Sequence, residues 1–242
     1  MRRTALFLAT VAAVILACGA AAFAQQANVI NCPPATLPPP DEDPPPCLGT
    51  DGPDVIKGST YPECCESIWG LGGDDKIYGR AGIDHIAGDN PGDPTVTGND
   101  TIHAGAGGGS MSGMGGDDLL IGGSSTDLTY GDDGNDRLVG KGKNDRLDGG
   151  PGDDLVIGGA SGGGPDQLFG DVGADLIDGG NGTDLIYTAS WTDEWNDRPT
   201  DGRKDVVSCG LDYDTVWYKK GEDEVADDCE ELHEYQLPSS TP

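Results

Sequence analysis

The sequence predicts an all-β fold, a parallel β-roll (or β-solenoid) built from nine-residue repeats. The first observation behind this prediction is a run of three consecutive nine-residue units in one register, at residues 131–157. Each unit begins with glycine, carries aspartate at its sixth position and has an aliphatic residue at its eighth. The second observation is that the same register continues over most of the chain. A fixed short period indicates that each unit buries its apolar residue only against neighbouring units.

Each unit divides into a turn and a strand. Its first six residues are rich in glycine, aspartate and asparagine, which favour turns, because glycine adopts positive φ freely and the other two form local hydrogen bonds. Its last three residues suffice for one short strand, whose middle side chain points inward. Two units therefore make one coil of about 18 residues, and each turn stacks on the turn two units later at a spacing of roughly 4.8 Å.

Fourteen such units are expected over residues 49–187. The second and the twelfth carry three extra residues each, at 58–69 and 158–169, and the fifth carries seven, at 88–103. The sixth unit has Gly109 where the aspartate belongs, and the eighth has Thr129 at the apolar position. The expected strands are centred, in chain order, on Ile56, Ile68, Ile77, Ile86, Ile102, Met111, Leu120, Thr129, Leu138, Leu147, Val156, Leu168, Ile177 and Ile186.

Residues 188–242 are expected to form a C-terminal cap with degenerate repeats and a tail. Three aspartate–valine pairs keep the register but lack the turn glycines: Asp205 with Val207, Asp214 with Val216, and Asp223 with Val225. Because a solenoid needs a terminal cap, these units are predicted to close the C-terminal end.

The segments before the repeats indicate export. Residues 1–24 are predicted to be a secretory signal peptide, because two arginines precede an apolar run that ends in Ala22-Phe23-Ala24. Cys18 follows a short apolar run, which leaves a lipoprotein anchor as the alternative. Residues 25–48 are proline-rich, with eight prolines at 31–46, and are expected to form an extended spacer. The predicted location is secreted, or extracellular.

Six cysteines remain after Cys18 is removed with the signal peptide, and in an exported chain they suggest three disulfides. Cys209 and Cys229 are 20 residues apart, close to one coil, so they are predicted to stack and bond. Cys47 and the vicinal pair at 64–65 are also about one coil apart, which suggests a matching bond. The partner of Cys32 within that pair stays open. The alternatives are reduced thiols or a zinc site, although the C-x₂₋₄-C pairs that zinc clusters use are absent from the sequence.

Alternate units lie on opposite edges of the solenoid, so the sixth-position carboxylates form two columns. Such a column repels itself at strand spacing, and Ca²⁺, which takes roughly 6–8 oxygen ligands, is the natural bridge. The odd units are expected to form the main calcium ladder, with up to about six ions between adjacent turns: Asp54, Asp75, Asp100, Asp118, Asp136, Asp154 and Asp175. The even units supply a second set, which is expected to be strongest at its last two members: Glu66, Asp84, Gly109, Asp127, Asp145, Asp166 and Asp184. The alternative is that these aspartates only cap turns through hydrogen bonds.

The pattern G-G-x-G-x-D-x-U-x resembles the calcium-binding nonapeptide of the RTX, or haemolysin-type, repeat family. The resemblance implies that the sixth-position aspartate supplies a side-chain oxygen to Ca²⁺ and that neighbouring glycine carbonyls supply the remaining ligands. Typical members leave the cell through a C-terminal secretion signal, whereas this chain has an N-terminal one. The chain is more similar to short, cysteine-stapled members of the family. Toxin activity is therefore not predicted.

Composition and motifs exclude several functions. Forty-three acidic residues against fourteen basic ones give a net charge of −29, which disfavours nucleic acid and anionic membranes as partners. Beyond the signal peptide no apolar run reaches the length of a transmembrane segment. The three histidines belong to no H-E-x-x-H motif and no G-x-S-x-G elbow is present, so no catalytic residue and no enzyme activity are expected.

The predicted function is that of a secreted, monomeric calcium-binding protein with a structural or surface-associated role. One alternative is an adhesin, or a solenoid that binds carbohydrate or a partner through exposed aromatics. Its partner would be a cell-surface or extracellular polymer, and the aromatic candidates are Trp69, Tyr78, Trp191 and Trp195. A polysaccharide-acting β-helix enzyme is a third alternative, although its coils are longer than two nine-residue units.

Overall fold

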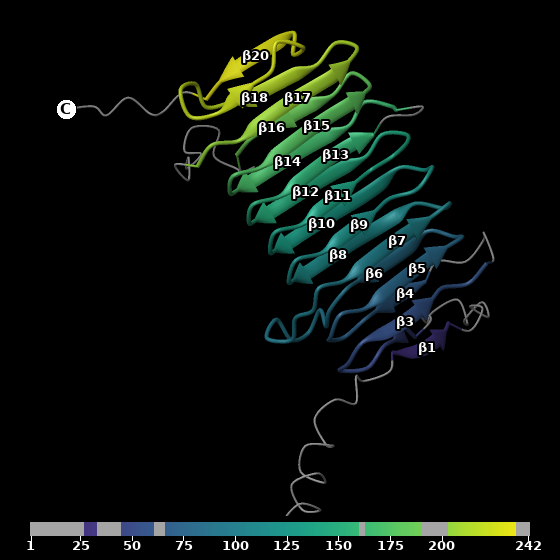
Figure 1. Cartoon of the computed structure of the whole chain (residues 1–242). Coiled ribbons are helices and arrows are strands. Elements are labelled where there is room, and N and C mark those ends of the chain that lie inside the picture. The colour runs from purple at the N-terminus through teal and green to yellow at the C-terminus, as the bar shows by residue number, and fades with distance from the viewer. Residues whose placement is uncertain (1–26, 33–44, 61–65, 160–162, 190–202, 236–242) are drawn as a thin grey trace, which may run out of the picture.

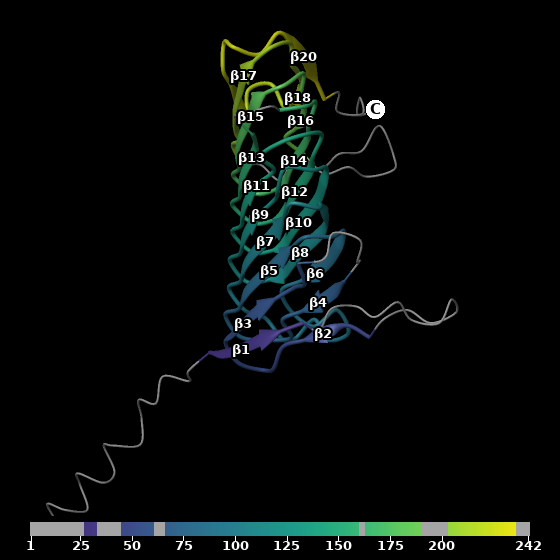
Figure 2. The same cartoon turned by 90° about the vertical axis from the view of Figure 1, so that its right-hand side faces the viewer.

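A computed structural model describes residues 27–32, 45–60, 66–159, 163–189 and 203–235. These residues form two ten-stranded sheets, and successive strands alternate between them (Figures 1 and 2). All the neighbouring strands pair in parallel, and the described part of the chain contains no helix, hence none that could cross a membrane. The predicted parallel β-roll is therefore confirmed.

The odd-numbered strands form the first sheet. Their order in the sheet is their order in the chain: β1 (Asn28–Asn31), β3 (Asp54–Lys57), β5 (Lys76–Arg80), β7 (Thr101–Gly105), β9 (Leu119–Ile121), β11 (Arg137–Val139), β13 (Leu155–Gly159), β15 (Leu176–Asn181), β17 (Val206–Leu211) and β19 (Glu224–Val225).

The even-numbered strands form the second sheet in the same way. They are β2 (Cys47–Leu48), β4 (Ser67–Trp69), β6 (Asp84–Ala87), β8 (Gly109–Gly115), β10 (Asp127–Asp133), β12 (Arg146–Pro151), β14 (Gln167–Val172), β16 (Leu185–Tyr187), β18 (Thr215–Tyr218) and β20 (Glu231–Glu234). Figure 2 shows the two sheets as two parallel rows with the turns between them.

The core between the sheets consists mainly of one inward side chain per strand, and β7 and β17 add Ala104 and Cys209. The register aligns the eighth positions of stacked units, as in Ile56 with Ile77 and Leu138 with Val156. These side chains are almost fully buried, and the column on the second sheet includes Thr129 at 0% exposure. The Oγ1 atom of Thr129 has no hydrogen-bond partner, so this polar atom interrupts an otherwise apolar column.

The roll begins before the first regular repeat. Strand β1 pairs with β3, and β2 pairs with β4, where Cys47 lies opposite Ile68. Cys47 bonds to Cys32 across 15 residues, so the predicted bond from Cys47 to the vicinal pair, and from that pair to Cys32, is wrong. The reason is the insertion in the second unit: its three extra residues make Ile68, and not the vicinal pair, the residue that stacks on Cys47. The vicinal pair itself lies outside the described residues.

The degenerate units close the other end in the predicted register. Val207 stacks on Ile177 and on Val225, and Val216 stacks on Ile186. The predicted Cys209–Cys229 disulfide is present, with Cα atoms 5.2 Å apart. It ties β17 to the segment that leads into β20, the last strand.

Candidate metal centre

The sixth-position aspartates of the odd turns form one continuous row. The main-chain N–H of each aspartate donates to the Oδ1 atom of the aspartate one coil later, at N–O distances of 2.6–2.9 Å. All the members are buried. At this spacing the row contains the seven predicted residues and one more: Asp54, Asp75, Asp100, Asp118, Asp136, Asp154, Asp175 and Asp205. It continues into the cap, where Asp205 N–H donates to Oδ1 of the half-buried Asp223 at 3.3 Å.

The even turns form a second row that is broken where Gly109 replaces the aspartate. Glu66 N–H donates to Asp84 Oδ1 at 3.3 Å, but Asp84 N–H then donates to the carbonyl of Gly108. The row resumes at Asp127, and the later N–O distances are 2.7–2.9 Å. This second segment comprises Asp127, Asp145, Asp166, Asp184 and Asp214.

These hydrogen bonds use only one oxygen of each carboxylate. The other oxygen is buried and has no hydrogen-bond partner in most members of the two rows. It is the Oδ2 atom of Asp75, Asp84, Asp100, Asp118, Asp136, Asp145, Asp154, Asp184 and Asp214. A buried carboxylate oxygen without a donor costs folding free energy. A cation is therefore the kind of partner that these turns require.

The first-position glycines create the space around these oxygens. A Cβ atom on Gly70 would lie 2.3 Å from Asp75 Oδ2 and 2.0 Å from the carbonyl oxygen of Gly88, one coil later. A carboxylate and a carbonyl oxygen thus converge on the place that any larger residue would fill. The same pairing of oxygens recurs at Gly49, Gly58, Gly79, Gly88, Gly113, Gly122, Gly131, Gly140, Gly149, Gly158 and Gly179. Carboxylate and backbone carbonyl oxygens are the ligands that Ca²⁺ prefers, so these residues fit this ion.

Burial and mutual repulsion oppose ionisation of both rows when no cation is bound. Burial raises the pKa of Asp100 to about 8. The negative charges of Asp118 and Asp75 raise this pKa further, whereas the hydrogen bond from Asp75 N–H lowers it. The pKa of Asp136 is raised to about 8 for the same reasons. Burial raises the pKa to about 7 in Asp75, Asp84, Asp118, Asp145, Asp154 and Asp166, and to about 6 in Asp184.

Turn capping explains only the first aspartate of each segment. Thr50 N–H donates to Asp54 Oδ2 at 2.6 Å, and Gly123 N–H donates to Asp127 Oδ2 at 2.7 Å. In both carboxylates the buried atom without a partner is then Oδ1. The alternative prediction, that the sixth-position aspartates only cap turns, does not account for the second oxygen.

Turn capping does explain a further row of side chains, which is exposed and which sequence reasoning missed. At the fifth position of the odd turns, each side-chain oxygen accepts the N–H of the residue one coil later, at 2.9–3.1 Å. The row alternates charged and neutral side chains: Asp74, Asn99, Asp117, Asn135 and Asp153. This alternation is visible in the sequence and separates like charges that would otherwise stack at strand spacing.

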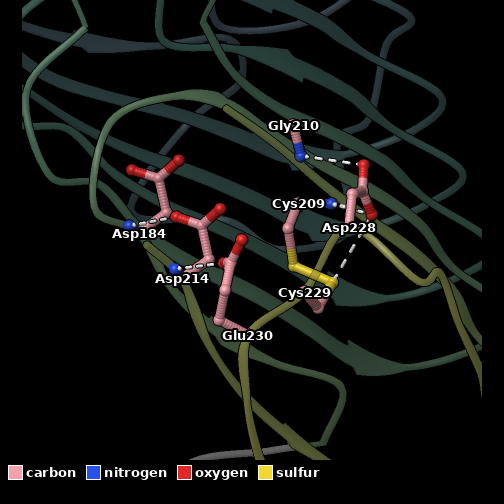
Figure 3. Close-up of a disulfide and its surroundings, with 7 residues drawn as sticks. All are labelled: Asp184, Cys209, Gly210, Asp214, Asp228, Cys229 and Glu230. Carbon is pink, nitrogen blue, oxygen red and sulfur yellow. Dashed lines mark hydrogen bonds between the residues drawn. A yellow bond between two sulfur atoms is a disulfide. The ribbon is translucent and has the colours of Figure 1, made fainter. Parts of the chain in front are cut away.

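The C-terminal cap prolongs the even row, which sequence reasoning did not assign to the metal centre. Figure 3 shows Asp184, Asp214 and Glu230 joined in series. Asp214 N–H donates to Glu230 Oε2 at 3.0 Å, so a glutamate ends the row.

A cluster beside this row looks like a metal site but is a disulfide with a capping carboxylate. Cys209, Asp228 and Cys229 offer ligand atoms within 4.8 Å of one another. Both sulfur atoms are used in the disulfide, so no thiolate is present to bind a metal (Figure 3). Asp228 instead accepts the N–H groups of Cys209 and Gly210, at 3.3 and 3.1 Å.

The histidines and exposed aromatics do not gather into one site. His85 Nδ1 lies 2.7 Å from Ser110 Oγ, and His103 stacks on Tyr78 with ring centroids 5.1 Å apart. His233 stacks on Trp217 at 4.5 Å. Trp69 lies in β4 of the even sheet, whereas Tyr78 lies in β5 of the odd sheet. The candidates Trp191 and Trp195 lie outside the described residues.

Comparison with protein families agrees with this geometry. Five segments match the model of the RTX calcium-binding nonapeptide repeat, at residues 66–90, 95–129, 107–138, 130–161 and 161–190. Together they span half of the chain. No curated protein matches the sequence. The matched segments coincide with the regular coils that carry both aspartate rows, and the chain belongs to the RTX calcium-binding nonapeptide repeat family.

Proposed function

We propose that this protein is a secreted calcium-binding module, without enzymatic activity, whose roll folds around rows of Ca²⁺ ions. The observation that carries the proposal is the set of buried carboxylate oxygens without donors, most of which are Oδ2 atoms that face a carbonyl oxygen across a glycine. Bound Ca²⁺ neutralises these carboxylates and serves as the partner of the oxygens that have no donor. The chain itself contributes the twelve predicted aspartates, together with the carbonyls of the first-position glycines.

The proposed role of the ions is to complete the fold. Without the ions, the aspartates of one row bring like charges together at strand spacing. The apolar core between the sheets is thin, with mainly one side chain per strand, and offers little to offset this repulsion. Because the unfolded chain does not hold the turns together, binding free energy becomes folding free energy. We propose that the chain stays largely unfolded where calcium is scarce and folds after export, in a structural or surface-associated role.

Two features support a secreted location. Two disulfides form among the described residues, and disulfides persist in oxidising compartments. The sequence of residues 1–24 has the pattern of a secretory signal peptide. Their removal from exported protein, measured by mass spectrometry of the mature chain, is the direct test. A mature N-terminus at Met1 would contradict this part of the proposal.

Limited proteolysis tests the coupling of calcium to folding. In millimolar Ca²⁺ we expect a protease-resistant fragment that spans the regular coils, and in chelator we expect cleavage throughout them. The same concentration of Mg²⁺ is the matched control, because the smaller ion demands octahedral geometry and retains its water. Equal resistance in calcium and in chelator would contradict the proposal.

A groove on the outer face of the even sheet favours a second candidate, the binding of an extended extracellular polymer. It crosses several coils and is lined by the seventh-position residues of the even units: His85, Ser110, Leu128, Arg146, Gln167 and Leu185. Leu128→Glu would abolish polymer retention in calcium, whereas Leu119→Glu, at the same position of the odd sheet, would not. Equal retention of both variants would exclude the groove as the binding face.

A further inference from the structure

The seven-residue insertion of the fifth turn brings an additional carboxylate into the odd row. Asp89, the second residue of that turn, is 1% exposed. In the odd turns from the third unit on, apart from this one, the second residue has a left-handed backbone, as in Met114 (φ 79°) and Asp132 (φ 66°), and the Asp132 side chain is only half-buried. Asp89 does not have this conformation. The insertion therefore changes the path of the turn and buries a charged side chain that the regular turns leave outside.

A hydrogen bond within the insertion holds the Asp89 carboxylate. Its Oδ2 atom accepts the N–H of Gly98 at 3.3 Å. Its Oδ1 atom is buried and has no hydrogen-bond partner. One carboxylate oxygen is thus held by an amide, and the other still lacks a partner.

The surroundings of Asp89 are the sixth-position aspartates of three successive coils. Its charge acts on Asp75, Asp100 and Asp118, each of which also has a buried Oδ2 atom without a partner. A Cβ atom on the adjacent Gly88 would lie 2.1 Å from Asp100 Oδ2 and 2.7 Å from the carbonyl oxygen of Gly113. None of the ion pairs among the described residues involves these four aspartates. The fifth turn therefore buries one carboxylate more than a regular odd turn, and none of the ion pairs among the described residues neutralises it.

We propose that Asp89 is an additional calcium ligand and makes the fifth turn the site of highest affinity in the roll. This inference rests on the proposed function, because it concerns the same ions. Calcium affinity rises with the number of charged ligands and with the rigidity of the site, and Asp89 adds to both. The fifth turn is then the first to fill as calcium rises, and it orders the coils on either side of it.

The test is a calcium titration of the full mature chain after chelator treatment, followed by calorimetry and native mass spectrometry. The wild type should bind one ion at least about tenfold more tightly than the others. Asp89→Asn keeps the acceptor for the Gly98 N–H but removes the charge, and it should abolish this tight step while the weaker steps remain. The matched control is Asp171→Asn, the same change at the second position of the thirteenth turn, which should leave the tight step unchanged.

Hydrogen exchange on the wild type provides a measurement that does not depend on how the variants fold. At one equivalent of Ca²⁺, amides of residues 97–118 should become protected before those of the other coils. Protection that develops evenly along the roll, or an Asp89→Asn titration that coincides with that of the wild type, would overturn the assignment of Asp89 alone. Absence of calcium binding by the wild type would overturn the proposed function together with it.

Discussion

Asp136 and Asp154 are linked by a hydrogen bond that leaves half of the acceptor carboxylate unused. The N–H of Asp136 donates to Asp154 Oδ1 at 2.7 Å, whereas Asp154 Oδ2 is buried without a partner. One oxygen therefore sets the spacing of the coils, and the other remains to bind a cation. This division of labour explains why aspartate, rather than the isosteric asparagine, occupies the sixth position along the odd row.

Asp136→Asn is expected to have opposite effects with and without calcium. The amide oxygen still accepts the Asp118 N–H, so the coil spacing is kept, but the charge is removed. In chelator the variant should be more stable than the wild type, because repulsion within the row falls. In saturating calcium it should be less stable, with affinity for the neighbouring ions reduced about tenfold, or about 1.4 kcal/mol. Circular dichroism measures both effects: the β-sheet signal at fixed temperature in chelator, and the thermal midpoint in saturating calcium.

The matched control for that variant is Asp117→Asn, the same change one residue earlier. Asp117 lies in the exposed row and accepts the N–H of Asn135. Its replacement should change calcium affinity by much less than Asp136→Asn does. Equal losses in the two variants would show that overall charge, and not the buried row, determines calcium affinity.

The metal-free protein is expected to lose stability as the pH rises. In the folded chain the pKa values of Asp100 and Asp136 are raised to about 8 from an ordinary value of 3.8, so the folded state binds more protons than the unfolded state. Stability is then greatest near pH 4 and falls as the pH rises through 8. In chelator the β-sheet signal in circular dichroism, recorded at one fixed temperature, should be larger at pH 5 than at pH 8.

Calcium affinity should increase as the pH rises, because Ca²⁺ and protons compete for the same carboxylates. The calcium concentration at half-saturation should increase as the pH falls from 8 to 6. An affinity that does not change over this range would show that the buried aspartates are not the ligands.

Gly131→Ala should weaken calcium binding without adding or removing a charge. The new Cβ atom would lie 2.4 Å from Asp136 Oδ2 and 2.3 Å from the carbonyl oxygen of Gly149, where these two oxygens converge. We expect calcium affinity to fall about tenfold or more, together with the thermal midpoint in calcium. Gly92→Ala is the control, because the nearest atom to its Cβ would be Asn90 Oδ1 at 3.3 Å. Similar losses in both variants would contradict this explanation.

Thr129→Val should stabilise the roll in calcium. The Thr129 hydroxyl is fully buried in the apolar column and has no hydrogen-bond partner, and valine has nearly the same shape. Removing the unsatisfied group should raise the free energy of unfolding by about 1 kcal/mol. Thr101→Val, at a half-buried outer position of β7, should change it by less. Denaturant unfolding at fixed calcium compares the two, and a destabilised Thr129→Val variant would imply that the hydroxyl has a partner in solution.

Periodicity alone predicted the strands, their alternation between two sheets and the sixth-position aspartates, because each depends on the spacing within one unit. What it missed depends on departures from that spacing. Strand β1 has no glycine turn before it. The insertion in the second unit places Ile68, and not the vicinal cysteines, opposite Cys47. Asp89 lies in an irregular turn, where position in the repeat does not predict which way a side chain points. The exposed row could have been found from its alternation of aspartate and asparagine.

The most direct measurement of the central claim is a calorimetric titration of the chelator-treated mature chain with Ca²⁺, with circular dichroism recorded at each step. Several ions should bind per chain, and the β-sheet signal should increase with occupancy, because the ions neutralise the buried aspartate rows. A β-sheet signal that is complete before any calcium is added, with no heat of binding, would contradict the account and identify the protein as a metal-independent solenoid.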